Sequence, residues 1–235
     1  MVAARPLTRD PERRRGRRRP AIALVGLLLA GAGRSFAASD GCIVLEDFSR
    51  SSEQAFPEGW KARKDSGRSV YAVRVENGVR FLRASARSIC IQAAREREWD
   101  LKEYPVLRWR WRPRVFPRDA NEQSGKNDSV LAVYAIFPYS RFAVKSLKYV
   151  WSERVPKGTR LESSRGLTQV LVLESGPPAA TDGWVEERVH VAEDYRRRFN
   201  EAGLPTPAGI AVLTDSDDTE TYAEGDYADF EACRG

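Results

Sequence analysis

Residues 70–86 read VYAVRVENGVRFLRASA, and this stretch decides the fold. Two runs rich in Val, Tyr, Phe and Leu flank the pair Asn77 and Gly78. A tight hairpin turn needs positive φ at both of its central residues, and Asn and Gly tolerate that conformation. The stretch therefore predicts two antiparallel strands, 70–75 and 79–86, joined by a tight turn.

Similar short runs of β-branched and aromatic residues, bounded by Gly, Pro, Asn and Asp, recur along the chain, whereas helical periodicity is nearly absent. One short helix is expected from Ala192 to about Glu201, ended by Gly203 and Pro205. We predict an all-β fold, a jelly-roll-like β-sandwich with about eleven strands and one short helix, in a single domain at residues 38–235. The expected strands are 42–48, 70–75, 79–86, 88–94, 106–112, 129–137, 147–151, 168–174, 184–191, 208–214 and 227–232.

The first 37 residues have the pattern of a cleavable signal peptide. Arginines crowd residues 13–19, apolar and small residues fill 21–33, and Ser35 and Ala37 suit a cleavage site after residue 37. The apolar run would span only about 20 Å as a helix, against a hydrocarbon core of roughly 30 Å, so no membrane anchor is expected after cleavage. We predict a periplasmic or secreted protein, exported by the general secretory or the twin-arginine route.

The leader also explains the basic charge of the chain. The formal charge is +6, but residues 1–37 hold nine arginines and two acids, which leaves 30 basic and 31 acidic residues, a charge of −1, in the remainder. No nucleic-acid partner is therefore expected.

Two cysteines near the ends of the exported part can form a disulfide in an oxidising compartment. If Cys42 pairs with Cys233 across two antiparallel strands, facing positions sum to 275, and the alternation separates apolar from mostly polar residues. We therefore predict the disulfide Cys42–Cys233. Cys90, between Ile89 and Ile91, is expected to be a buried free thiol.

Residues 107–112 read LRWRWR, so one face of a strand carries Leu and two tryptophans and the other carries three arginines. A row of arginines could bind the carboxylates of an acidic polysaccharide. Alternatively, the tryptophans lie in the core and the arginines pair with acids on a neighbouring strand. Loop aromatics could add sugar contacts. The predicted ligand-binding residues are Arg108, Arg110, Arg112, Trp60, Asp128 and Tyr139.

Clustered carboxylates on loops are typical ligands of calcium. The richest acidic stretch, residues 215–220, follows an expected strand, and further aspartates lie near both chain ends. An ordinary solvated turn is the alternative for this stretch, because the spacing is not that of an EF-hand loop. The candidate ligands of a structural calcium are Asp47, Asp215, Asp217, Asp226 and Asp229.

Several segments together resemble a bacterial family known as domain of unknown function 3047. They include Phe56-Pro57 with Gly59-Trp60, Tyr104-Pro105, residues 107–111 and 126–128, Tyr149 to Ser152, Gly183-Trp184, Asp194-Tyr195 and residues 210–217. The resemblance implies a single exported β-rich domain without an established activity. A looser likeness is to carbohydrate-binding jelly-roll modules, in which acids near the first and last strands frame a structural calcium.

From these observations we predict a non-catalytic exported module that binds a glycan or another component of the cell envelope. One alternative is a glycoside hydrolase or polysaccharide lyase that uses paired carboxylates such as Asp128 and Asp215. Another is a periplasmic accessory protein whose loops dock a protein partner.

Overall fold

The computed structural model describes residues 41–235, and the predicted signal peptide, residues 1–37, lies outside them. The described residues form thirteen strands, one α-helix and two short 3₁₀ helices. No helix among them is long and apolar enough to cross a membrane. The strands are β1 (Cys42–Glu46), β2 (Trp60–Ala62), β3 (Tyr71–Glu76), β4 (Val79–Arg87), β5 (Ala93–Glu96), β6 (Val106–Val115), β7 (Leu131–Ser140), β8 (Ala143–Ser152), β9 (Arg160–Ser163), β10 (Thr168–Ser175), β11 (Val185–His190), β12 (Gly209–Leu213) and β13 (Tyr222–Cys233); the helices are η1 (Asp65–Ser69), η2 (Ser164–Gly166) and α1 (Val191–Phe199).

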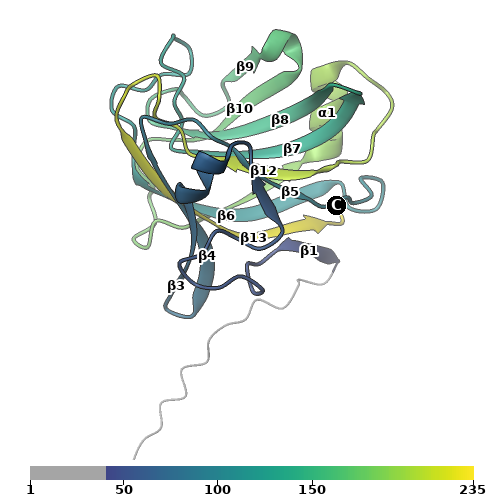
Figure 1. Cartoon of the computed structure of the whole chain (residues 1–235). Coiled ribbons are helices and arrows are strands. Elements are labelled where there is room, and N and C mark those ends of the chain that lie inside the picture. The colour runs from purple at the N-terminus through teal and green to yellow at the C-terminus, as the bar shows by residue number, and fades with distance from the viewer. Residues whose placement is uncertain (1–40) are drawn as a thin grey trace, which may run out of the picture. The chain divides into compact units, whose positions relative to one another are not determined.

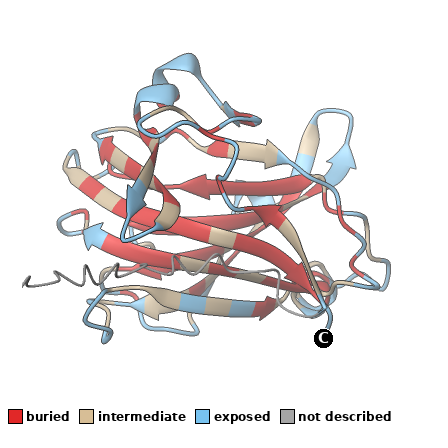
Figure 2. Cartoon of the chain, turned by 90° about the horizontal axis from the view of Figure 1, so that it is seen from below, coloured by how far each residue is buried: buried red, intermediate tan, exposed pale blue. Residues whose placement is uncertain are grey.

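The strands form two sheets that lie one above the other, which confirms the predicted β-sandwich (Figure 1). Sheet A has the order β11-β6-β13-β4-β3, with β1 also paired to β13. Sheet B has the order β2-β5-β12-β7-β8-β10-β9. All neighbours are antiparallel except β8 and β10, which run parallel. Buried residues are concentrated on the central strands of both sheets, and exposed residues on the loops and strand ends (Figure 2).

The hairpin predicted from residues 70–86 is present as β3 and β4, with φ of 52° at Asn77 and 77° at Gly78. The helix α1 begins one residue earlier than expected, because the ring Nδ1 of His190 accepts a hydrogen bond from Glu193 N (3.2 Å) and so caps it. It ends at Phe199, because Asn200 adopts the left-handed conformation.

Two short strands, β2 and β9, were not expected, so residues 41–235 form thirteen strands rather than about eleven. The expected strand 88–94 is largely wrong: pairing begins at Ala93, and Ser88 has a positive φ of 49°. Cys90 therefore lies in an irregular segment; it is free, as predicted, but exposed rather than buried.

The core lies between the sheets and is rich in large aromatic side chains. Trp109 and Trp111 of sheet A are fully buried and pack on Tyr149 and Trp151 of sheet B, with ring centroids 5.7 and 5.6 Å apart. Tyr227 of β13 also crosses between the sheets, since its hydroxyl donates to Leu213 O at 2.8 Å. Burial of these side chains is the main favourable contribution to folding.

The disulfide Cys42–Cys233 is present and joins β1 to the end of β13. Cys42 faces Cys233, Ile43 faces Ala232 and Val44 faces Glu231, which is the register predicted from the sequence. A bulge then shifts the pairing so that Glu46 faces Phe230.

Candidate functional site

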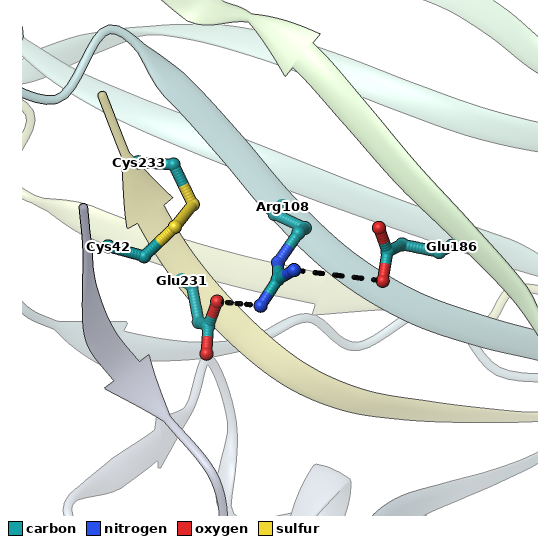
Figure 3. The surroundings of a disulfide bond; sticks show 5 residues. All are labelled: Cys42, Arg108, Glu186, Glu231 and Cys233. Carbon is teal, nitrogen blue, oxygen red and sulfur yellow. Dashed lines mark hydrogen bonds and ion pairs between the residues drawn. A yellow bond between two sulfur atoms is a disulfide. The ribbon is translucent and has the colours of Figure 1, made fainter. Parts of the chain in front are cut away.

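The arginine row of β6 lies on the outer face of sheet A, where each arginine pairs with carboxylates of neighbouring strands. Arg108 lies beside the disulfide between Glu231, with which it forms a close ion pair, and Glu186, 3.9 Å away (Figure 3). Arg110 Nε donates to Asp229 Oδ2 (2.6 Å). The arginines therefore pair with acids on neighbouring strands, as the alternative interpretation of the sequence predicted.

Arg112 is the most buried arginine of the row. Its Nη2 donates to Asp226 Oδ2 and to Glu76 Oε2, each at 2.7 Å. The hydrogen bond from Arg112 keeps the pKa of the Glu76 carboxyl below its usual value.

The five aspartates proposed for calcium do not meet at one place. Asp226 and Asp229 are paired with arginines on sheet A, and Asp47 accepts hydrogen bonds from Ser49. Asp215 and Asp217 follow β12 of sheet B, where each places a carboxylate oxygen close to the Cys90 thiol. The structure thus separates the predicted calcium ligands into different regions and leaves only Asp215 and Asp217 together.

The two aromatic candidates have different surroundings. Trp60, predicted to bind ligand, is buried: it is 4% exposed, packs on Phe48, and its Nε1 donates to Glu46 Oε2 (2.7 Å). Tyr139, at the end of β7, is 56% exposed, and the Lys145 ammonium lies 4.7 Å from its ring centroid. Neither side chain lines the groove described next.

A groove of about 760 Å³ lies on the outer face of sheet B. It arises from the alternation along the strands: in β8, Leu147 and Tyr149 point into the core, whereas Ser146 and Lys148 point outward into the groove. A second apolar cluster forms beneath these side chains on the same outer face. Its buried members are Ala132, Tyr134, Val150, Val170, Ala211 and Leu213.

One wall of the groove is the tip of the β7–β8 hairpin, which carries Phe142. This side chain is 89% exposed, the largest exposed fraction among the large apolar residues of the described chain. The cations Lys61, Arg63 and Lys148 also line the groove, together with a single acid, Asp215. The groove therefore combines an exposed aromatic ring with an excess of positive charge.

Asp215 lies at the polar end of the groove and is only 2% exposed. The Cys90 thiol donates to its Oδ2 at 3.3 Å. Burial, followed by the neighbouring Asp217, raises the pKa of the Asp215 carboxyl to about 8, although the Lys148 ammonium acts in the opposite direction. Burial, and then Asp215, raises the pKa of the Cys90 thiol to about 12.

Asp128, predicted to bind ligand or to act in catalysis, is fully buried and is not in contact with the groove. It accepts hydrogen bonds from the backbone N–H groups of Asp218 (3.1 Å) and Thr219 (2.8 Å) and from the Thr219 hydroxyl (2.5 Å). These hydrogen bonds tie Asp128 to the loop between β12 and β13, the loop that carries Asp217.

Glu122 is a half-buried acid that the sequence did not single out. It accepts hydrogen bonds from the hydroxyls of Ser129 (3.0 Å) and Ser152 (2.5 Å), and burial raises the pKa of its carboxyl. A single glutamate in an irregular segment, residues 116–130, gives no periodic signal by which it could have been found.

The fold and the groove define a β-sandwich protein with a ligand-sized groove across the outer face of one sheet. The chain belongs to the family of proteins of unknown function DUF3047, whose model matches residues 58–231. No curated protein matches the sequence of this chain. A solved structure of a meso-active thermostable cellulase, derived from the Cel12A cellulase of Rhodothermus marinus, is 13% identical, with 73% of this chain and 94% of that chain covered and a TM-score of 0.36.

Proposed function

We propose that this protein is an exported module that binds an acidic polysaccharide in the groove of sheet B. The observation that carries the proposal is Phe142, which stands 89% exposed at the rim of a groove of about 760 Å³. An exposed aromatic face packs well on the C–H face of a sugar ring, so a ring at the rim of a groove is suited to contact a saccharide.

The charge of the groove favours an anionic ligand. Three cations and one acid line it. Lys61 pairs with Glu96 at 2.7 Å, but both side chains are more than 70% exposed, so this pair is weak and can exchange for a ligand carboxylate. Uronic acid residues of a polysaccharide carry such carboxylates on rings that also stack on aromatic side chains.

Export is part of the proposal. The pattern of residues 1–37 supports a leader that takes the protein to the periplasm or outside the cell. The disulfide Cys42–Cys233 also supports it, because such bonds persist in oxidising compartments.

The test is binding to a panel of acidic and neutral polysaccharides, measured by affinity electrophoresis and calorimetry. We expect an acidic polymer to bind, Phe142→Ala to weaken binding at least fivefold, and Tyr139→Ala, an exposed aromatic outside the groove, to leave it unchanged. Arg63→Ala should weaken binding and reduce its dependence on salt, whereas Arg50→Ala, an exposed arginine elsewhere, should not.

Three results would contradict the proposal. Binding that is equal in Phe142→Ala and the unchanged protein would place the ligand outside the groove. Release of reducing or unsaturated ends from a bound polymer would make the groove an active site rather than a binding site. Failure of every polysaccharide to bind would exclude a glycan ligand and favour a protein partner.

A further inference from the structure

Cys90, Asp215 and Asp217 form a compact group of metal-ligating atoms at the polar end of the groove. The thiol sulfur and one carboxylate oxygen from each aspartate all lie within 4.8 Å of one another. The three residues come from two segments far apart in the sequence, the irregular segment before β5 and the loop after β12. Folding therefore brings together two oxygen ligands and one sulfur ligand.

The buried carboxylate of Asp215 is incompletely satisfied. Its Oδ2 accepts from the Cys90 thiol, but Oδ1 is inaccessible to solvent and no N–H or O–H group among residues 41–235 donates to it, while another acid, Asp217, lies next to the carboxyl. A buried carboxylate oxygen without a hydrogen-bond donor destabilises the folded state, so native proteins nearly always provide a partner. A cation between Asp215, Asp217 and Cys90 would supply that partner.

The loop that carries these aspartates is held in place before any ligand arrives. Asp215 N donates to Ser129 O (3.0 Å), and Ser216 N donates to Ile89 O (3.3 Å), which ties the loop to the segment that carries Cys90. On the other side of Asp217, the buried Asp128 fixes the next two backbone N–H groups. The ligands are thus positioned by backbone contacts and need little rearrangement.

We propose that Cys90, Asp215 and Asp217 form a zinc site. Zinc accepts mixed sulfur and oxygen ligands in tetrahedral geometry, whereas calcium takes oxygen ligands alone. With usual bond lengths, tetrahedral zinc separates a sulfur from an oxygen ligand by about 3.6 Å. One ligand atom from each of the three residues lies within 4.8 Å of the other two, a range that includes this separation.

Three protein ligands leave the fourth position of the zinc to water or to a group of the ligand. Cys90 and Asp215 both line the groove, so the proposed site borders it. On binding, the Cys90 thiol loses its proton to solvent and coordinates as thiolate. Zinc would add to the positive charge of the groove and so favour the anionic ligand proposed above. The zinc site itself does not depend on that ligand.

The experiment measures zinc binding by the purified protein, in the absence of saccharide, by calorimetry and equilibrium dialysis. We expect one zinc ion per chain and a higher melting temperature with zinc than with chelator. Cobalt(II) should give the near-ultraviolet charge-transfer absorption of a thiolate ligand. Cys90→Ser and Asp217→Asn should each weaken zinc binding at least tenfold, and Cys90→Ser should also abolish the cobalt absorption.

Asp47→Asn, which removes an exposed carboxylate on the other side of the sandwich, is the matched control and should bind zinc as the unchanged protein does. Cys90→Ser and Asp217→Asn change accessible side chains, so both variants should fold, which circular dichroism checks. The zinc site is refuted if no zinc binds, if zinc binds equally to both variants, or if cobalt binds without the thiolate absorption. Since no saccharide is present, these results stand apart from those on polysaccharide binding.

Discussion

Arg112 and Asp226 face each other across the β6–β13 pair, and both Nε and Nη2 of the guanidinium donate to Asp226 Oδ2, at 2.9 and 2.7 Å. Asp226 is fully buried and also accepts from Arg83 Nε, at 2.8 Å to its other oxygen. One buried carboxylate is thus shared by two arginines from strands on either side of it. This arrangement links β4, β13 and β6 on the outer face of sheet A.

Asp226→Asn should destabilise the protein by about 3 kcal/mol, because it leaves the two arginines without their shared counter-charge. Urea unfolding followed by tryptophan fluorescence measures the change. Glu96→Gln, which breaks the exposed pair with Lys61, should change the free energy of unfolding by less than about 0.5 kcal/mol. Equal effects of the two substitutions would contradict the assigned role of Asp226.

The two sides of the LRWRWR strand could be predicted from the sequence, but the partners of its arginines could not. Alternation alone places Trp109 and Trp111 on the face opposite the arginines. The pairing of Arg112 with Asp226 depends on a strand 114 positions away and on the bulge between Ala228 and Glu231. Local pattern carries no information on such long-range register.

The candidate site was only partly predictable for a related reason. Strands β7 and β12 carry apolar residues on both faces, such as Ala211 outward and Val212 inward, so their pattern indicates buried strands and gives no sign of a groove. The acidic stretch after β12 did single out Asp215 and Asp217. Their neighbour Cys90 was placed in a strand, because Ile89 and Ile91 flank it in the sequence.

Replacement of both cysteines of the disulfide, Cys42→Ser with Cys233→Ser, should destabilise the protein by ~5 kcal/mol in the chain-entropy treatment, because the bond closes a loop with a sequence separation of 191. The measurement is the free energy of unfolding, compared with that of the unchanged protein in the presence of reductant. The free energies of unfolding of the double variant and of the reduced unchanged protein should agree, since both proteins lack the same disulfide. Cys90→Ser should leave this quantity nearly unchanged.

Glu187 should make stability fall as the pH rises. Burial, and then the neighbouring Glu174, raises the pKa of the Glu187 carboxyl from 4.5 to about 7. The folded state therefore holds a proton that the unfolded state releases, so the stabilisation is complete below about pH 4.5 and is lost as the pH passes 7. Glu187→Gln, which keeps the shape without the charge, should be more stable than the unchanged protein by roughly 1–3 kcal/mol at pH 8 and by little at pH 4.5. Unfolding curves of both proteins between about pH 4.5 and 8 measure this difference in the free energy of unfolding. A difference that does not change with pH would contradict the raised pKa of Glu187.

Asp128→Ala should loosen the loop between β12 and β13 while leaving the sheets folded. The substitution removes the acceptor of three hydrogen bonds, two of them from the backbone N–H groups of Asp218 and Thr219. At about 1 kcal/mol or more for each bond to a charged acceptor, exchange of these two amide protons should become ten to a hundred times faster. Hydrogen–deuterium exchange resolved by residue measures this, with the amide of Val133 in β7 as an internal reference that should not change.

Because the same loop positions Asp217, Asp128→Ala should also weaken zinc binding. Faster exchange in the loop with unaltered zinc binding would show that Asp128 orders the loop without positioning a ligand.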